Sequence, residues 1–260
     1  LKLVSLYTDQ VPDSDTSRKW AKKFDVPIFK TVEETLTLGT GKLAVDGVLL
    51  VAEHGKYPKN ASGNTIYPKR RLFDAVQKVF RKTDQTVPVF VDKHLADNWA
   101  DAKWLHDTAR ELKVPLMAGS SLPVLWRYPP VDVKRGAKLK EIVAVSYHTL
   151  DAYGYHALEM VQCLVERRAG GETGVKQVQC LSGDAVWRAM DAGMFDRKLL
   201  DAVLKRLKKS PITRQPKRPL RELVKAPDMF VIEYRDGLKA FVLTLNGAVN
   251  EWGVAWKTVA

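Results

Sequence analysis

The fold of this chain is decided by the stretch Val87–Leu95, VPVFVDKHL. Its apolar centre, VFV, is followed at once by Asp92, Lys93 and His94. A short apolar run that ends in this way, with an amphipathic helix after it, is typical of a buried parallel β-strand. In open α/β sheets, ligands bind just beyond the carboxyl ends of the strands. The sequence therefore predicts that a carboxylate, an amine and an imidazole lie at a ligand-binding edge.

Two neighbouring stretches have the same form and also end in polar residues. Val45–Ala52 is followed by Glu53 and His54. Pro115–Ala118 is followed, after one glycine, by Ser120. Helical patterns separate these stretches, and such alternation predicts a parallel, doubly wound sheet. Because the strands of a parallel sheet share one direction, we expect the three polar ends to converge at one edge.

The strand–helix alternation stops near residue 125, where several prolines interrupt the chain. A helix cannot run through such a segment, so we divide the chain into residues 1–125 and 126–260. In the second part, Met229–Tyr234 and Leu238–Leu245 alternate around an Asp-Gly turn, as a β-hairpin does. We predict a Rossmann-like α/β dinucleotide-binding domain, followed by an α+β substrate-binding and oligomerisation domain with a mostly antiparallel, open sheet.

The chain begins at Leu1, just before a predicted strand at Lys2–Tyr7, and carries no charged-then-apolar signal segment. We expect that the N-terminus of a longer protein is missing, and that an export signal could have been lost with it. Thr8 and Asp9 end this strand. Either side chain fits the position from which a dinucleotide-binding sheet holds a ribose hydroxyl.

The composition, 45% hydrophobic and 28% charged, indicates a soluble globular protein. No apolar run approaches the ~20 residues of a membrane helix. Residues 197–225 hold nine of the twelve surplus positive charges and no aromatic side chain for base stacking. We therefore expect a small-molecule substrate and neither a nucleic-acid nor a membrane partner. Cys163 and Cys180 lack metal or redox spacing, so we expect two reduced, mostly buried thiols and a cytoplasmic protein.

Several stretches together resemble the Gfo/Idh/MocA family of oxidoreductases (glucose–fructose oxidoreductase, inositol dehydrogenase and relatives). VFVDKHLADNWADAKWLHDTARELKVPLMAGSS resembles the family's strand ending in Glu-Lys-Pro, its helix and its next strand. AVDGVLLVAEHGKY resembles the preceding strand and its cofactor-facing loop, and LKEIVAVSY resembles the first strand of the second domain. YGYHALEMVQCL resembles the helix start Gly-x-His-x-x-Asp. The resemblance covers most of residues 1–181.

This resemblance implies an oxidoreductase that uses NAD or NADP and acts on a carbinol carbon of a sugar, cyclitol or related polyol. It implies that Lys93 takes the place of the family's motif lysine, near the nicotinamide and the substrate. It also implies that His156 takes the place of a histidine that faces the substrate and often acts in proton transfer. Proteins of this architecture often pair through the sheet of the second domain, so a homodimer or tetramer is expected.

The sequence departs from the family pattern in several places. The Gly-x-Gly-x-x-Gly loop does not occur in this sequence, and we expect that the chain begins on the family's second strand. Gly39 and Gly41 precede a strand instead of a helix. His94 stands where the family has proline, and Ala152 where it has an acidic residue. Two alternatives therefore stay open: a lyase or hydrolase that uses transient oxidation, and a non-catalytic, ligand-binding sensor of the same fold.

Oxidation of a secondary alcohol needs a base that takes the hydroxyl proton. His156 needs little tuning for this role, and a desolvated Lys93 could have its pKa shifted down to it. The polar strand ends could instead bind a divalent ion, but none has ligand spacing such as H-x-x-x-H, so we expect no metal. The other predicted site residues are Asp9, Glu53, His54, Asp92 and His94 on the cofactor side, and Ser120, Tyr153 and Tyr155 on the substrate side.

Overall fold

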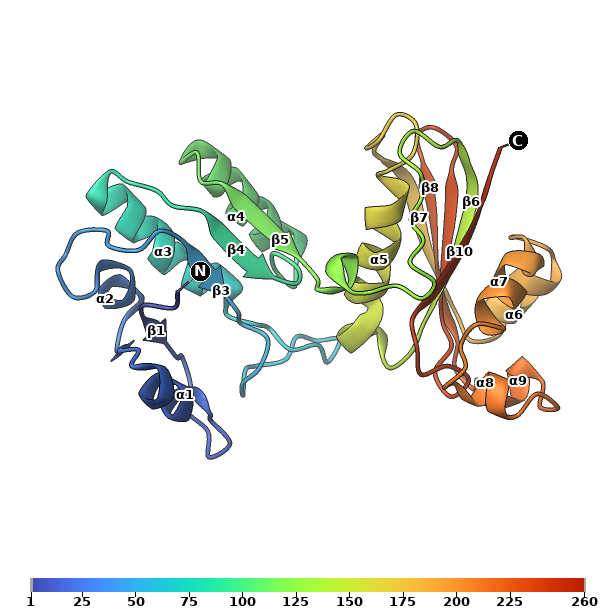
Figure 1. The fold of residues 1–260 in the computed structure, drawn as a ribbon, viewed down its shortest axis with the longest axis horizontal. Coiled ribbons are helices and arrows are strands. Elements are labelled where there is room, and N and C mark those ends of the chain that lie inside the picture. Colours follow the sequence, from blue (N-terminus) through green and yellow to red (C-terminus); the bar gives the residue numbers. More distant parts are fainter. Residues whose placement is uncertain (1, 260) are drawn as a thin grey trace. The chain divides into compact units, whose positions relative to one another are not determined.

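The structure, a computed structural model, describes residues 2–259 (Figure 1). The chain forms two compact units, Leu1–Gly119 and Ser120–Ala260, whereas the sequence placed the domain boundary after residue 125. The first unit contains parallel sheets with helices, and the second contains a mostly antiparallel sheet. The predicted fold class is therefore confirmed.

The first unit contains two separate parallel sheets. One pairs β1 with β2, and the other has the order β3-β4-β5. Strand β4 is central in its sheet and parallel to both neighbours, as expected of the buried parallel strand predicted from the VFV run. The strands are β1 (Leu6–Tyr7), β2 (Ile28–Phe29), β3 (Val48–Leu50), β4 (Val89–Asp92) and β5 (Leu116–Gly119). The helices are α1 (Ser17–Phe24), α2 (Val32–Thr37), α3 (Lys69–Thr83) and α4 (Trp99–Glu111).

The core of the first unit lies between the three-stranded sheet and helices α3 and α4. Val89 and Val91 of β4 are fully buried there, together with Phe73 and Phe80 of α3 and Leu105 of α4. Burying a side chain of this size stabilises the fold by about 1.5–3 kcal/mol each. This packing holds the end of β4 in a fixed position.

The opposite face of the same sheet corrects the expectation of strands buried on both sides. Leu49 is 69% exposed and Met117 is 66% exposed, and both lie opposite Phe90 of β4 in the sheet. The predicted strand Lys2–Tyr7 is also shorter than expected, because only Leu6 and Tyr7 pair with β2, and Val4 is exposed. An apolar sequence pattern reports which residues could be buried, but not whether a partner covers them.

The second unit is built on one five-stranded sheet with the order β10-β6-β9-β8-β7, in which only β6 and β9 are parallel. The predicted hairpin appears as β8 and β9. The strands of the five-stranded sheet are β6 (Leu139–Ser146), β7 (Val175–Ser182), β8 (Asp228–Tyr234), β9 (Lys239–Thr244) and β10 (Gly253–Thr258). The helices are α5 (Tyr155–Val165), α6 (Asp184–Asp191), α7 (Arg197–Leu204), α8 (Pro211–Arg214) and α9 (Leu220–Leu223). Two short helical turns, η1 (Leu122–Val124) and η2 (Leu150–Gly154), precede α5.

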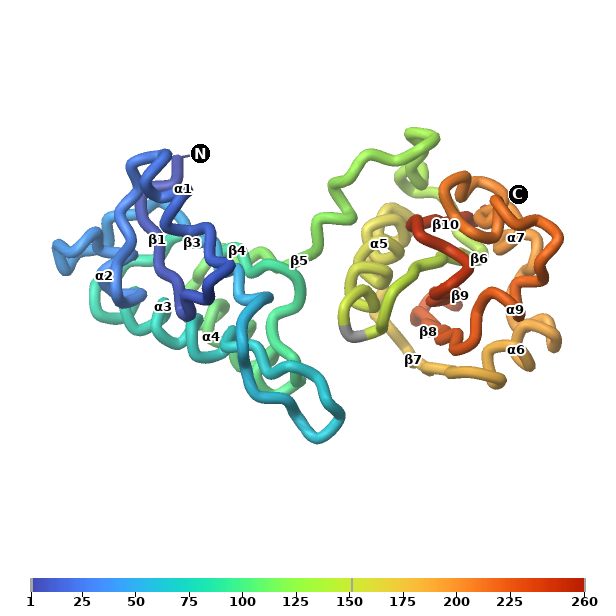
Figure 2. Tube along the Cα trace, turned by 90° about the horizontal axis from the view of Figure 1, so that it is seen from below, coloured from blue at the N-terminus to red at the C-terminus, as the bar shows by residue number. Residues whose placement is uncertain are grey.

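Helices pack on both faces of this sheet, with α5 along one side and α6, α7 and α9 along the other (Figure 2). Two apolar cores result, one on each face. The edge strand β7 remains exposed along nearly its whole length. Cys180 lies on this strand and is exposed, so the expectation that both thiols are mostly buried was wrong for it. Among residues 2–259, no helix combines the length and the apolar character needed to cross a membrane.

Candidate functional site

The backbone at the end of β4 leaves the strand conformation at Lys93, which has a φ of 62°. This left-handed conformation costs a residue with a Cβ roughly 1–2 kcal/mol. The amide of Lys93 still donates to the carbonyl oxygen of Gly119 at 2.9 Å, so the turn starts while the residue is paired with β5. A strained backbone at the end of a central strand is a common property of functional sites.

A lysine that the sequence analysis did not identify lies beneath this turn. Lys69, the first residue of α3, has no exposed surface (0%). Its Nζ donates to the carbonyl oxygen of Asp92 at 2.8 Å and to that of His94 at 2.6 Å. It also forms an ion pair with Oε1 of Glu53. One buried ammonium therefore connects the end of β4 with the residues that follow β3.

Glu53 lies between two lysines. Its Oε2 is 3.6 Å from Nζ of Lys93, while its Oε1 pairs with Lys69. The Lys93 ammonium also donates to Oδ2 of Asp92 at 2.8 Å. The predicted convergence of the ends of β3 and β4 is therefore seen for Glu53, Asp92 and Lys93. His54, the next residue along the chain, is exposed.

The charges in this cluster set the protonation of its members. Burial disfavours the ammonium of Lys93, but the hydrogen bond to Asp92 and the charge of Glu53 outweigh it, so the pKa of Lys93 is raised. Burial lowers the pKa of Lys69 despite its ion pair with Glu53. Burial, together with the charge of Lys69, also lowers the pKa of His94. Lys93 is therefore charged at neutral pH, and the expectation that its pKa is shifted down was wrong.

Asp9 is held by three donors of the chain itself. Its Oδ1 accepts from the Tyr7 hydroxyl at 2.9 Å, and its Oδ2 accepts from the Tyr57 hydroxyl at 2.8 Å and from Nη2 of Arg71 at 2.6 Å. The hydrogen bond from Arg71 is the main reason why the pKa of Asp9 is lowered. A carboxylate has about four acceptor positions, so little of Asp9 remains for the ribose hydroxyl proposed from the sequence.

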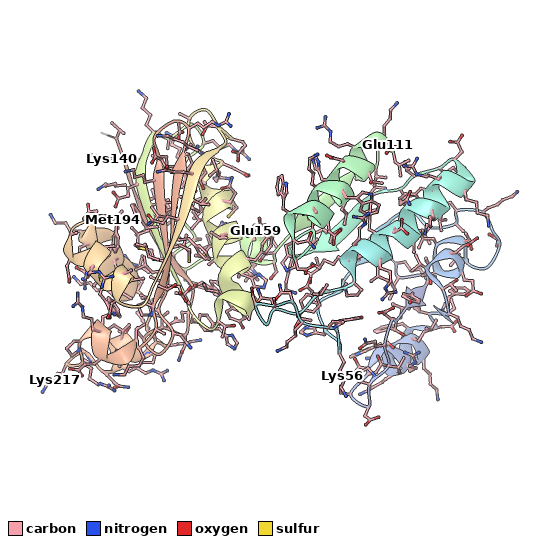
Figure 3. The ribbon with its side chains drawn as sticks, turned by 180° about the vertical axis from the view of Figure 1, so that it is seen from behind. Lys56, Glu111, Lys140, Glu159, Met194 and Lys217 are labelled. Carbon is pink, nitrogen blue, oxygen red and sulfur yellow. The ribbon has the colours of Figure 1, made fainter. Side chains whose placement is uncertain are left out.

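The same contacts attach the loop between β3 and α3 to the end of β1. Besides the Tyr57–Asp9 bond, the side chain of Gln10 accepts from the amide of Lys56 at 2.8 Å and donates to its carbonyl oxygen at 3.1 Å. Figure 3 labels Lys56 on this loop. Long loops within compact domains are often functional, and these contacts fix the start of this one.

In the second unit, His156 lies in the first turn of α5 and contacts Ser120. Nδ1 of His156 is 2.5 Å from Oγ of Ser120, which also accepts from the amide of Leu122 at 3.1 Å. The amide of Ser120 donates to Oε2 of Glu159 at 3.3 Å. Figure 3 labels Glu159 on α5. Ser120, predicted at the polar edge of the first sheet, is therefore a buried partner of His156. The Ser120 contact orients the imidazole ring.

Aromatic rings surround His156 on its other side. Tyr153 stacks against Trp252 at 5.2 Å and against His148 at 4.9 Å, measured between ring centroids. The ring of His156 meets Tyr153 edge-on at 5.9 Å, and Tyr155 lies 6.5 Å from it. The sequence analysis missed His148 and Trp252. His148 follows directly after a predicted strand, as Asp92 and Glu53 do, so the same polar-end rule could have found it.

Charged groups elsewhere form ion pairs, and Lys257 of β10 lies between the carboxylates of Glu141 and Asp196. Among residues 2–259, no group of three or more His, Cys, Asp or Glu side chains is arranged to hold a metal ion. In the basic segment 197–225, Arg197, Arg218 and Arg221 form ion pairs with nearby carboxylates. This segment forms α7 to α9 and the loops between them.

No family model and no curated protein matches the sequence. Solved structures match the fold. A dehydrogenase from Chromobacterium violaceum is 15% identical, with a TM-score of 0.52 over 100% of this chain and 62% of that one. Biliverdin reductase from Synechocystis sp. PCC 6803, solved with biliverdin and NADP+, is 14% identical, with a TM-score of 0.51 over 99% of this chain and 69% of that one. UDP-N-acetylglucosamine 3-dehydrogenase GnnA from Acidithiobacillus ferrooxidans is 10% identical, with a TM-score of 0.51 over 97% and 65%.

The chain has the fold of these dehydrogenases and reductases. The resemblance to the Gfo/Idh/MocA family is thereby confirmed at the level of the fold. The chain spans 62–69% of the length of these three solved structures. Identities of 10–15% establish the fold and leave activity, cofactor and substrate to be argued from the site itself.

Proposed function

We propose that this protein is an NAD(P)-dependent oxidoreductase that acts on a carbinol carbon, or the corresponding carbonyl, of a sugar-like small molecule. The observation that carries the proposal is the ammonium of Lys93, held between Asp92 and Glu53 at the carboxyl end of the central strand β4. That edge is where α/β sheets of this kind bind ligands. A structure of the same fold was solved with NADP+, and another acts on a nucleotide sugar.

The described residues fit one end of such a cofactor. Exposed His54 follows β3, and the partly exposed Asp92 and Lys93 lie at the carboxyl end of β4, where polar groups could contact a nicotinamide. The glycine-rich turn that would receive the pyrophosphate does not occur within residues 2–259, since Gly39 and Gly41 end α2 and precede a strand. When bound, the nicotinamide supplies the redox chemistry, and the chain's own residues handle the proton.

Lys93 is suited to donate a proton or a charged hydrogen bond to an oxygen of the substrate. Its raised pKa keeps Nζ protonated at neutral pH, and its two carboxylate partners hold the side chain in place. A positioned charge of this kind stabilises a developing alkoxide. In the second unit, His156 is the second residue that we propose to act on the substrate, with its Nδ1 side oriented by Ser120.

The cofactor is tested by titrating the protein with NAD and NADP while tryptophan fluorescence is followed. We expect a saturable change at submillimolar concentration of one of them. An absence of binding at millimolar NAD and NADP, checked by calorimetry, would overturn the oxidoreductase and leave the ligand-binding sensor.

The site is tested by turnover on a panel of sugars and cyclitols. Lys93→Met and His156→Gln should each lower kcat by about 10²–10⁴-fold, the usual contribution of a positioned acid or base. Lys113→Met is the matched control for Lys93, because Lys113 is an exposed lysine of the same unit with a similar left-handed backbone, φ 55°. Full turnover in both site variants would remove the assignment.

A further inference from the structure

Lys69 is the most deeply buried charged side chain in the described residues, and the proposed chemistry does not use it. Taking an ammonium out of water costs several kcal/mol. Its three N–H donors face three acceptors: the carbonyl oxygens of Asp92 and His94, and the carboxylate of Glu53. The first two contacts are hydrogen bonds and the third is an ion pair, and the two carbonyl partners, Asp92 and His94, flank Lys93.

The two carbonyl contacts constrain the backbone between them. Both oxygens lie within hydrogen-bond distance of one nitrogen, 2.8 and 2.6 Å, so they can be no farther apart than the sum of these distances. In an extended strand, equivalent atoms two residues apart are separated by about 6.6 Å. The chain must therefore contract between Asp92 and His94. The left-handed Lys93, with a φ of 62°, provides this contraction.

We propose that Lys69 is the positioning residue of this site, and that its ammonium imposes the left-handed turn that carries Lys93. The third contact supports this role, since Glu53 receives Lys69 on one oxygen and approaches Lys93 with the other. Lys69 thus fixes the backbone of Lys93 directly and its side chain through Glu53. The relevance of this positioning to catalysis rests on the proposed function; the positioning itself does not.

A stability cycle tests the proposal without any substrate. Glycine adopts a left-handed backbone without strain, whereas alanine does not. Lys93→Gly and Lys93→Ala both remove the ammonium, so the difference between their melting temperatures reports the backbone conformation alone. In the otherwise unchanged protein, we expect Lys93→Gly to melt roughly 2–4 °C above Lys93→Ala.

The same pair is then measured in a Lys69→Met background, which removes the ammonium and keeps an apolar side chain of similar length. We expect the difference in melting temperature between Lys93→Gly and Lys93→Ala to shrink to a small fraction of its value in the Lys69 protein, because the turn is no longer imposed. Lys113, with a φ of 55°, provides the matched control. The difference between Lys113→Gly and Lys113→Ala should be the same in both backgrounds. If Lys69→Met does not fold, Lys69→Gln retains the two N–H donors of its amide group, and the difference should be intermediate.

An unchanged difference at position 93 in a folded Lys69 variant would overturn the proposal, since Lys69 would then contribute only to overall stability. The proposal would also be overturned if the Gly–Ala difference at position 113 changed with the Lys69 background as much as the difference at position 93. Turnover separates this proposal from the proposed function. If the Gly–Ala difference at position 93 does not depend on residue 69, while turnover still requires the Lys93 ammonium, the role of Lys69 is refuted. If that difference does depend on residue 69, but Lys93→Met keeps full turnover, the oxidoreductase site is refuted.

Discussion

Replacing Tyr57 by phenylalanine should release the loop between β3 and α3. The Tyr57 hydroxyl donates to Asp9 at 2.8 Å, and hydrogen bonds to charged groups contribute about 1.5–3 kcal/mol. Asp9 keeps its bonds from Tyr7 and Arg71, and water can reach this partly exposed cluster, so we take a loss of about 1 kcal/mol. That loss corresponds to a roughly 5-fold larger population of the open loop. The raised pKa of Tyr57, about 12, keeps this donor protonated throughout the neutral range.

Limited trypsin digestion measures this opening, because Lys56 and Lys59 lie in the loop. When opening is fast relative to cleavage, the cleavage rate follows the open population, so Tyr57→Phe should be cut in the loop about 5-fold faster. Tyr67→Phe is the control, since the ring of Tyr67 meets that of Tyr57 at 6.4 Å while its hydroxyl is not among the Asp9 donors. Equal cleavage of the two variants, at equal melting temperature, would refute the anchoring role of Asp9.

Two further outcomes follow from charged pairs. Asp236→Asn should lower the free energy of unfolding at pH 7 by about 1–2 kcal/mol, because the nearly buried Arg168 loses the carboxylate 2.7 Å from its Nε. The hydrogen bond from Arg168 lowers the pKa of Asp236 in the folded protein. The stabilisation is therefore complete above the ordinary aspartate pKa and is lost as the pH falls through the lowered pKa of the folded state. Urea melts of the two proteins should accordingly converge in acid. Asp92→Asn should lower the pKa of Lys93, and activity that needs the ammonium should then fall at a lower alkaline pH in a pH–rate profile.

The central strand could be predicted because its signal is local. The run VFV can be buried, and the three polar residues that follow it cannot continue a core strand, which fixes the carboxyl end near Asp92. The exposure of Leu49 and Met117 could not be predicted, because their apolar character is the same whether or not a layer covers them. The separation of β1-β2 from β3-β4-β5 is likewise a property of the assembled unit and not of any single segment.

Lys69 shows a site residue that a closer reading of the sequence could have found. It lies four residues before Phe73 and seven before Val76, so it continues the buried stripe of α3, where an apolar residue is expected. A lysine on such a stripe needs a buried partner, and Glu53 was already predicted at a neighbouring strand end. The contact between Ser120 and His156 had no such signal, since it depends on how η1 packs against α5.

The charge of Lys93 bears on the role that this side chain can take in the proposed chemistry. A lysine that serves as a base must first lose its proton, and each unit of raised pKa adds about 1.36 kcal/mol to that cost at neutral pH. Asp92 and Glu53 increase the cost, while Lys69 holds Glu53 so that it cannot turn away. A site selected for a lysine base would place a cation or an apolar wall beside Nζ instead of two carboxylates. The geometry therefore fits the proposed role of Lys93 as an ammonium that gives a proton or a charged hydrogen bond to an oxygen of the substrate.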